Sequence, residues 1–245
     1  MTTFSENRPI RRALPHLAAL IVIVACLRLA VWQGERAEEK ADLLAHWDSA
    51  DTIELAAIGD EAAPRFAEVS ASGHFDTRRH VLLDNQVRNN HPGVHVFTPF
   101  HPDGSEHVYM VNRGWHPWDR RSGAPPEFAT PDGPVTIRGR LNDPPRVGLK
   151  IGEAEPLDTE NWPNLMTYFE TDKIQAVLGE EVREQVLLLD PDHPDHLSGD
   201  DWQLVTMGPE RHQGYAFQWF SIALAVFLIW LILTVRPLIR RRNQA

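Results

Sequence analysis

Two long apolar runs, one near each end of the chain, constrain its fold more than any other feature. The run from Tyr215 to Val235 has 21 residues and no charge, and the run from Ala13 to Trp32 has 20 residues and one charge, Arg28. A helix needs about 20 apolar residues to cross the hydrocarbon core of a bilayer. We therefore predict transmembrane helices at residues 13–33 and 215–235, with the lipid bilayer as one partner of this protein.

The first run has two other interpretations, a cleaved signal peptide or a lipoprotein signal with Cys26 as the lipidated residue. No A-x-A cleavage site follows a short apolar core, and the apolar run continues beyond Cys26 to Trp32. We therefore expect a retained anchor. Arg28 lies about one turn from the outer end, where its side chain can either snorkel to the interface or contact an anionic ligand.

Basic residues flank both runs on the sides that face away from the middle of the chain. They are Arg8, Arg11 and Arg12 before the first run, and Arg236, Arg240, Arg241 and Arg242 after the second. The positive-inside rule places both termini, including a basic tail at 236–245, in the cytoplasm and residues 34–214 outside it. A short segment before the first run, without a Ser/Arg-rich transit peptide, favours a bacterial inner (plasma) membrane with a periplasmic central domain.

The middle of the chain is acidic. From Gly34 to Gly214 it carries 16 Lys and Arg against 33 Asp and Glu, a formal charge near −17. Such a domain repels nucleic acid, so we expect no nucleic-acid partner. The chain has one cysteine, which excludes an internal disulfide and a CxxC pair.

The residues between the runs predict a mostly antiparallel β domain, barrel-like or sandwich-like, at 34–214. Segments rich in Val, Ile, Phe and Tyr alternate with Gly, Pro, Asp and Asn. We expect strands near Phe66–Phe75, His80–Gln86, Val94–Pro99, His107–Trp115, Val135–Leu141, Met166–Thr171, Gln185–Leu189 and Trp202–Thr206. A polar helix at Glu35–Ser49 either continues the first membrane helix or lies on the surface, and a short helix at Lys173–Leu178 ends at Gly179.

Sequence signatures of enzymes are absent: there is no GxSxG, P-loop, GxGxxG or HExxH. We expect no enzyme and no catalytic residue. Among eleven histidines in the middle segment, His193 and His196 in DPDHPDH are the best metal candidates, but the proline between them favours a solvated acidic loop over Asp190–Asp201. The segment VNRGW, Val111–Trp115, is interpreted as a strand end with a glycine turn and a tryptophan that closes the core.

His212 differs from the other histidines because it lies at the outer end of the second apolar run. On a helix it shares one face with Tyr215 and Trp219. A neutral imidazole at an apolar aromatic interface can ligate haem iron. The alternative is an interface histidine that only forms hydrogen bonds. The candidate cofactor-binding residues are therefore His212, Tyr215 and Trp219, with no metal beyond a haem iron at His212.

Several motifs together resemble one known family. They begin with Trp32-Gln33 and a following helix that carries Arg36 and Lys40, and they continue through Gly73–Phe75, Gly93–Phe100, Val111–Trp115, Gly139–Leu141, Asn161–Trp162 and Arg211–Phe220. The pattern resembles the Surfeit locus protein 1 family, the Shy-type cytochrome c oxidase assembly factors. VNRGW combined with a terminal HxxYAxxW carries most of the specificity.

The resemblance implies a non-enzymatic assembly factor that helps haem a insertion into subunit I of cytochrome c oxidase, or stabilises that subunit. It implies haem a as a transient cofactor, with the family's histidine before the second span matching His212. It also implies subunit I, haem A synthase or other oxidase assembly factors as partners. Many relatives carry two asparagines before that histidine, where this chain has Glu210-Arg211. The alternative is a two-span scaffold that holds assembly intermediates and binds no cofactor.

Overall fold

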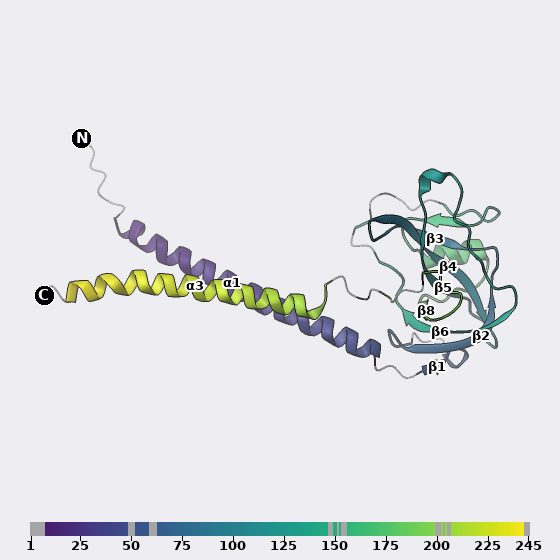
Figure 1. The fold of residues 1–245 in the computed structure, drawn as a ribbon, viewed down its shortest axis with the longest axis horizontal. Coiled ribbons are helices and arrows are strands. Elements are labelled where there is room, and N and C mark those ends of the chain that lie inside the picture. Colours follow the sequence, from purple (N-terminus) through teal and green to yellow (C-terminus); the bar gives the residue numbers. More distant parts are fainter. Residues whose placement is uncertain are drawn as a thin grey trace. The chain divides into compact units, whose positions relative to one another are not determined.

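Long helices stand at both ends of the chain. In the computed structural model, which describes residues 8–48, 52–58, 63–146, 149–150, 152, 156–198, 202, 204 and 207–242, helix α1 is Arg8–Asp48 and helix α3 is Pro209–Arg242 (Figure 1). Each is long and apolar enough to cross a membrane, over Ala13–Trp47 and Pro209–Arg236, and only 6% of each apolar stretch is buried. An apolar helix left this exposed matches a lipid-facing span better than a core helix.

The polar helix expected after the first span is the continuation of α1. The helix runs without a break to Asp48, which decides between the two alternatives left open by the sequence; Ser49 lies outside the described residues. Helix formers fill this segment, and no proline or glycine interrupts it after Gly34. The two terminal helices form one compact unit, and residues 46–202 form a second.

The second unit is a β-barrel. Its wall consists of β2 (Glu68–Phe75), β6 (Pro134–Asn142), β8 (Val186–Leu189), β5 (Tyr109–Pro117) and β4 (His91–Pro102), paired in that order. Strand β4 pairs again with β2, from Phe75 opposite Phe100 to Gly73 opposite Pro102, and this pairing closes the barrel. Closure removes the exposed sheet edges that an open sandwich would keep. Of the two architectures expected, the barrel is therefore the one observed.

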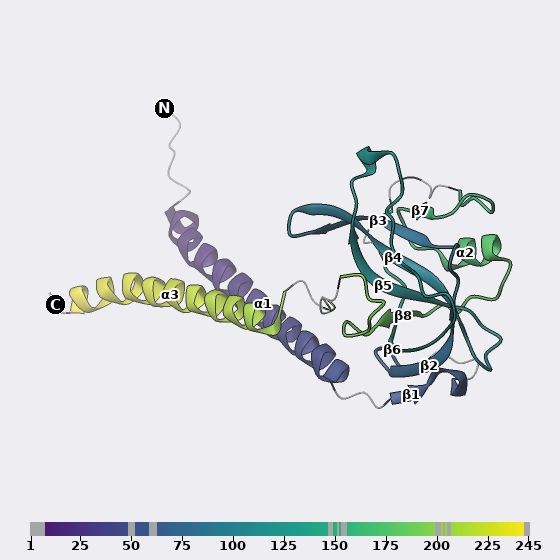
Figure 2. The ribbon, with the colours of Figure 1, turned by 45° about the vertical axis from the view of Figure 1, so that its right-hand side comes forward.

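Three further strands extend the barrel wall. They are β1 (Thr52–Glu54) beside β2, β3 (Val81–Arg88) beside β4, and β7 (Asn164–Met166) beside β3. Figure 2 shows β3 and β7 continuing the sheet past β4. The pairs β1–β2, β3–β7 and β5–β8 are parallel and the other pairs are antiparallel, as expected for a mostly antiparallel domain.

Alternating burial along the strands builds the barrel core. Strand β2 alternates half-buried or exposed positions with buried Val69, Ala71 and Phe75. Helix α2 (Thr171–Leu178) packs Ile174 and Leu178 against a second cluster around Phe97 and Met110, and it ends at Gly179 with φ +70°. Short 3-10 turns lie at Leu55–Ala57 and Arg120–Ser122.

Some predicted boundaries are wrong. The strand expected at Met166–Thr171 is shifted, because β7 ends at Met166 and Thr171 already begins α2. Strand β1 was not predicted, since three residues are too few for a period to be detected. Trp202 and Leu204 are not in a strand, and the remaining residues of the strand expected at Trp202–Thr206 lie outside the described residues.

Candidate functional site

The two membrane helices pack side by side and antiparallel, as Figures 1 and 2 both show. Along each helix the covered positions include a series spaced by four and three residues: Ala19, Ile23, Cys26, Ala30, Gln33 and Ala37 on α1, and His212, Ala216, Trp219, Ala223, Val226 and Trp230 on α3. This spacing is the 3.5-residue repeat of helices that pack along a shared seam. Small side chains near the middle of the two series, Cys26 (5% exposed) and Ala223 (3% exposed), are buried, and small residues of this kind are common where helices meet in lipid.

His212 lies on this seam and contacts the other helix. Its ring Nδ1 is 2.7 Å from Oε1 of Gln33. An amide oxygen only accepts hydrogen bonds, so the imidazole Nδ1 carries the proton and donates it. The remaining ring nitrogen, Nε2, then keeps its lone pair, which is the form of histidine that binds a metal.

The two aromatic candidates occupy different surroundings. Trp219 follows His212 by seven residues and is half-buried on the same seam. Tyr215 is 45% exposed and lies beside the seam. The structure therefore places His212 and Trp219 together against α1 and leaves Tyr215 facing outward from the helix pair. A role for all three in binding a cofactor stays a prediction.

The histidine-rich loop after β8 is bonded to the barrel wall, since the N–H of Leu197 donates to the carbonyl of Arg113 in β5 (2.7 Å). His193 accepts a hydrogen bond at Nδ1 from the backbone N–H of Asp195 (3.2 Å) and donates from Nε2 to the carbonyl of Thr136 (3.2 Å). His196 is buried, at 8% exposed, with its ring edge-on to that of Trp202. The expectation of a fully solvated loop is wrong at His196. Among the described residues, no group of three or more His, Cys, Asp or Glu side chains could hold a metal ion.

VNRGW is the centre of a buried polar cluster rather than a strand end. Gly114, with φ +102°, lies inside β5 where the register with β4 shifts, so it forms a bulge. Arg113 is 1% exposed, and no sequence signal marked it as buried. Its guanidinium donates to the carbonyls of Asp195 (3.1 Å) and Ala129 (2.6 Å) and to the hydroxyl of Thr130 (2.8 Å).

Arg113 also shapes the chemistry of its surroundings. Its guanidinium lies over the rings of Phe75 and Phe128, 5.5 and 5.8 Å from their centroids. Burial and then the positive charge of Arg113 lower the pKa of His80 to about 4, so that histidine is neutral at physiological pH. This cluster ties β5 to two loops distant in sequence, which is a structural role.

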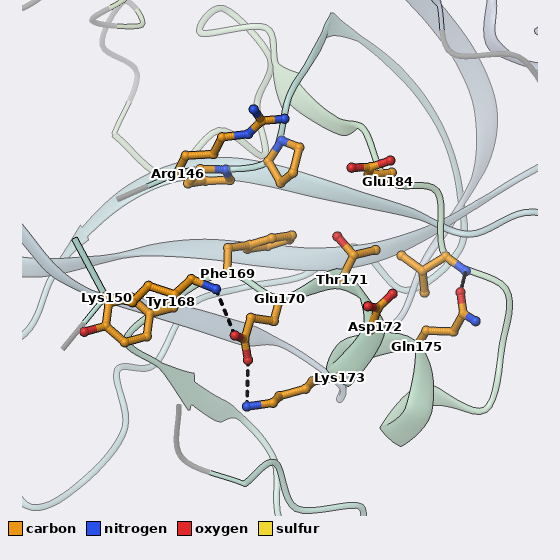
Figure 3. Close-up of a pocket in the computed structure, with 13 residues that line it drawn as sticks. Arg146, Lys150, Tyr168, Phe169, Glu170, Thr171, Asp172, Lys173, Gln175 and Glu184 are labelled. Atoms are coloured by element: carbon orange, nitrogen blue, oxygen red, sulfur yellow. Dashed lines mark hydrogen bonds and ion pairs between the residues drawn. The ribbon is translucent and has the colours of Figure 1, made fainter. Parts of the chain in front are cut away.

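A cavity of about 700 Å³ in the barrel unit lies between the 144–146 segment and the start of α2 (Figure 3). Two of its cations are already paired, because Glu170 binds Nζ of Lys150 (3.0 Å) and Nζ of Lys173 (2.6 Å). Asp172 and Glu184 add negative charge to the lining. The cavity is therefore of mixed charge and does not select an anionic or a cationic ligand.

The fold and the seam define a class of protein: a membrane protein whose two transmembrane helices flank a mostly antiparallel β-barrel domain. Its candidate site is a single histidine between the helices and not a multi-ligand metal centre. The chain belongs to the SURF1 family, whose model matches residues 20–224. SURF1 proteins are known generally as oxidase assembly factors and are not a catalytic family.

Two curated relatives illustrate the similarity. A SURF1-like protein of Rickettsia bellii (strain RML369-C) is 25% identical over 224 residues, which cover 88% of this chain and 89% of the relative. A SURF1-like protein of Caenorhabditis elegans is 21% identical over 255 residues, which cover 92% of this chain and 76% of the relative. The part that the family model matches includes the barrel, α1 from residue 20 and α3 up to residue 224.

Proposed function

We propose that this protein assists the assembly of cytochrome c oxidase by holding haem a through His212 and passing it to, or stabilising, subunit I. The observation that carries the proposal is the hydrogen bond from His212 Nδ1 to Gln33, which leaves Nε2 as a lone-pair donor. His212 would be the residue that holds the haem, and the bound haem would supply an iron centre to which an imidazole nitrogen can bind.

A single histidine and the apolar surface of the helix that carries it suit an apolar macrocycle better than a bare ion. A bare divalent ion needs about four ligands, whereas haem iron needs one or two from the protein. Exposed apolar side chains follow His212 along α3 toward the C-terminus, including Phe217 (74% exposed) and Phe220 (52% exposed). Within a bilayer such a surface can pack against a porphyrin ring or against the helices of a membrane-embedded partner.

The proposed setting is the inner membrane of a bacterium, with both termini in the cytoplasm and the barrel in the periplasm. The basic flanks of both helices support this orientation, and His212 then lies at the periplasmic end of α3. The partners in this proposal are subunit I, haem A synthase or other oxidase assembly factors. The acidic barrel is the face available for recognition by these proteins outside the bilayer.

The pigment of the purified protein tests the proposal. The full chain, co-produced with a haem A synthase and purified in detergent, should show haem absorption, and His212→Ala should lose it. His16→Ala is the matched control, because His16 is also a histidine of the helix pair and hydrogen-bonds to Trp230 across it. Equal haem loading in wild type and His212→Ala would remove His212 from the mechanism.

A scaffold that holds assembly intermediates without a cofactor gives a different result in the same experiment. It predicts capture of oxidase subunits by a protein that stays colourless even beside a haem A synthase. The two proposed functions have the same partners, so the presence or absence of haem in the purified protein is what distinguishes them.

A further inference from the structure

Two histidines, half-buried His212 and exposed His16, lie toward opposite ends of the α1–α3 pair, and each bonds to the opposite helix. His212 contacts Gln33, and His16 contacts Trp230 with 2.9 Å between its Nδ1 and the indole Nε1. The rings of His16 and Trp230 are also edge-to-face, with centroids 6.1 Å apart. Both contacts use Nδ1, so they can be compared directly.

The partner of each histidine determines which ring nitrogen carries the proton. The indole Nε1 of Trp230 can only donate, so His16 Nδ1 accepts and the neutral ring has its proton at Nε2. The amide oxygen of Gln33 can only accept, so His212 Nδ1 donates and Nε2 is unprotonated. The same side chain is therefore held in opposite tautomers at the two ends of one helix pair.

Only the tautomer at His212 is ready to bind a metal through Nε2. A ligating histidine commonly donates its other ring N–H to a carbonyl or carboxylate, which fixes the ring orientation and raises the basicity of the ligating nitrogen. Gln33 supplies such a carbonyl from a neighbouring helix and not from the helix that carries His212. Both residues are half-buried on the seam, where water competes less for the bond.

We infer that Gln33 is a positioning residue: its side-chain oxygen holds His212 in the Nδ1–H tautomer and presents Nε2 as the ligating atom. The inference rests on the proposed haem-binding function for its purpose, but the tautomer itself is a property of the apo protein. Because Gln33 and His212 come from different helices, the ligand is competent only when α1 and α3 are packed together. Separation of the two helices would thus release the ring and weaken its hold on the ligand.

The first test measures the tautomer without haem. Apo protein labelled with ¹⁵N-histidine in detergent should show the Nδ1–H form at His212 and the Nε2–H form at His16. Gln33→Leu removes the acceptor at similar size and should convert His212 to a mixture of forms, while Gln33→Glu keeps an acceptor and should keep the Nδ1–H form. Wild-type His212 with its proton at Nε2, or an unchanged His212 tautomer in Gln33→Leu, would overturn the inference whatever the haem result.

The second test uses ferric haem titrated into the same detergent samples. Gln33→Leu should weaken binding about 10–100-fold, the range seen when the hydrogen-bond partner of a metal-binding histidine is removed. Gln33→Glu should restore binding and lower the midpoint potential of the bound haem, because a carboxylate makes the imidazole a stronger donor. A merely structural role of Gln33 would not shift the potential, so an unchanged potential in Gln33→Glu counts against the inference.

Trp230→Phe is the matched control for loss of a hydrogen bond across the seam. It should change the His16 resonances and leave haem affinity at the wild-type value. Equal loss of haem in Trp230→Phe and Gln33→Leu would show that helix packing, and not the tautomer, controls binding, and would overturn the inference. If wild-type protein takes up no haem while its tautomers are as stated, the proposed function fails and the positioning of His212 by Gln33 stands.

Discussion

The buried guanidinium of Arg113 allows a sharp test of how the barrel is held together. We predict that Arg113→Lys destabilises the barrel at least as much as Arg113→Met, although lysine keeps the charge. The reason is geometric: three acceptors, the carbonyls of Ala129 and Asp195 and the hydroxyl of Thr130, surround the planar fork of the guanidinium. An ammonium group is a compact point charge that cannot match this arrangement.

The magnitude follows from the contacts. Hydrogen bonds from a charged donor contribute about 1.5–3 kcal/mol each, so three of them contribute roughly 5–9 kcal/mol. Arg113→Met loses these bonds but also removes a buried charge, whose desolvation costs several kcal/mol. The net loss should be about 2–4 kcal/mol for methionine. Lysine retains the desolvation cost and loses most of the bonds, so its loss should be about 3–5 kcal/mol.

Thermal unfolding of the full chain in mild detergent, followed by near-ultraviolet circular dichroism, measures this loss. For a domain of about 150 residues each kcal/mol lowers Tm by roughly 2–4 °C, so both variants should melt about 5–15 °C below wild type. Arg138→Met is the control, since Arg138 is exposed on β6 and such substitutions stay within about 0.5 kcal/mol. An Arg113→Lys protein that melts with the wild type, or well above Arg113→Met, would refute the argument.

Three further predictions concern the barrel unit, and one of them has its control in α3. The pKa of His80 is about 4 in the folded protein and 6.5 in the unfolded chain, so as the pH falls the unfolded chain takes up this proton before the folded protein does. The free energy of unfolding of the barrel should therefore fall by about 3 kcal/mol between pH 6.5 and pH 4. Urea titrations at these two pH values should show a smaller fall for His80→Gln than for the wild type. Gly73→Ala should lower Tm strongly, because an added Cβ would lie 2.1 Å from a backbone oxygen of β4. At Gly214 an added Cβ would have no atom within 4 Å, so Gly214→Ala should leave Tm unchanged or raise it slightly in the same thermal unfolding experiment. Arg79→Ala should speed amide hydrogen exchange in α2, since Arg79 bonds the last α2 carbonyl, Leu178 O (3.1 Å); unchanged exchange would contradict this capping role.

Local patterns were sufficient for much of the fold. Hydropathy located both spans, and the alternation of apolar and polar residues located most barrel strands, because both signals depend on near neighbours in the chain. The end of α2 at Gly179 was also predicted, since a left-handed residue favours glycine. The sequence did not locate the turn between β3 and β4. That turn is Asn89-Asn90, both with positive φ, and the pair of asparagines is a sequence signal that could have identified it.

At the candidate site, too, local sequence patterns identified some features and missed the contacts between distant residues. The sequence singled out His212 by its position at the mouth of a span, and it paired Gln33 with Trp32 only as part of a family motif. The bond between His212 and Gln33 joins residues 179 positions apart, and no local period encodes it. Likewise, Arg113 and His196 are polar residues that look exposed in sequence but are buried in the barrel.

What the amino-acid sequence determined by itself is the class of the protein: two membrane helices around an acidic β domain, because hydrophobicity, charge and strand period are properties of short segments. What only the tertiary structure decided is which polar groups lie inside and what each one bonds to. A buried polar side chain is tolerated only when distant segments supply its partners, as Ala129, Thr130 and Asp195 do for Arg113. The same holds for His212, whose Nδ1 has its hydrogen-bond acceptor only because α1 brings Gln33 beside it.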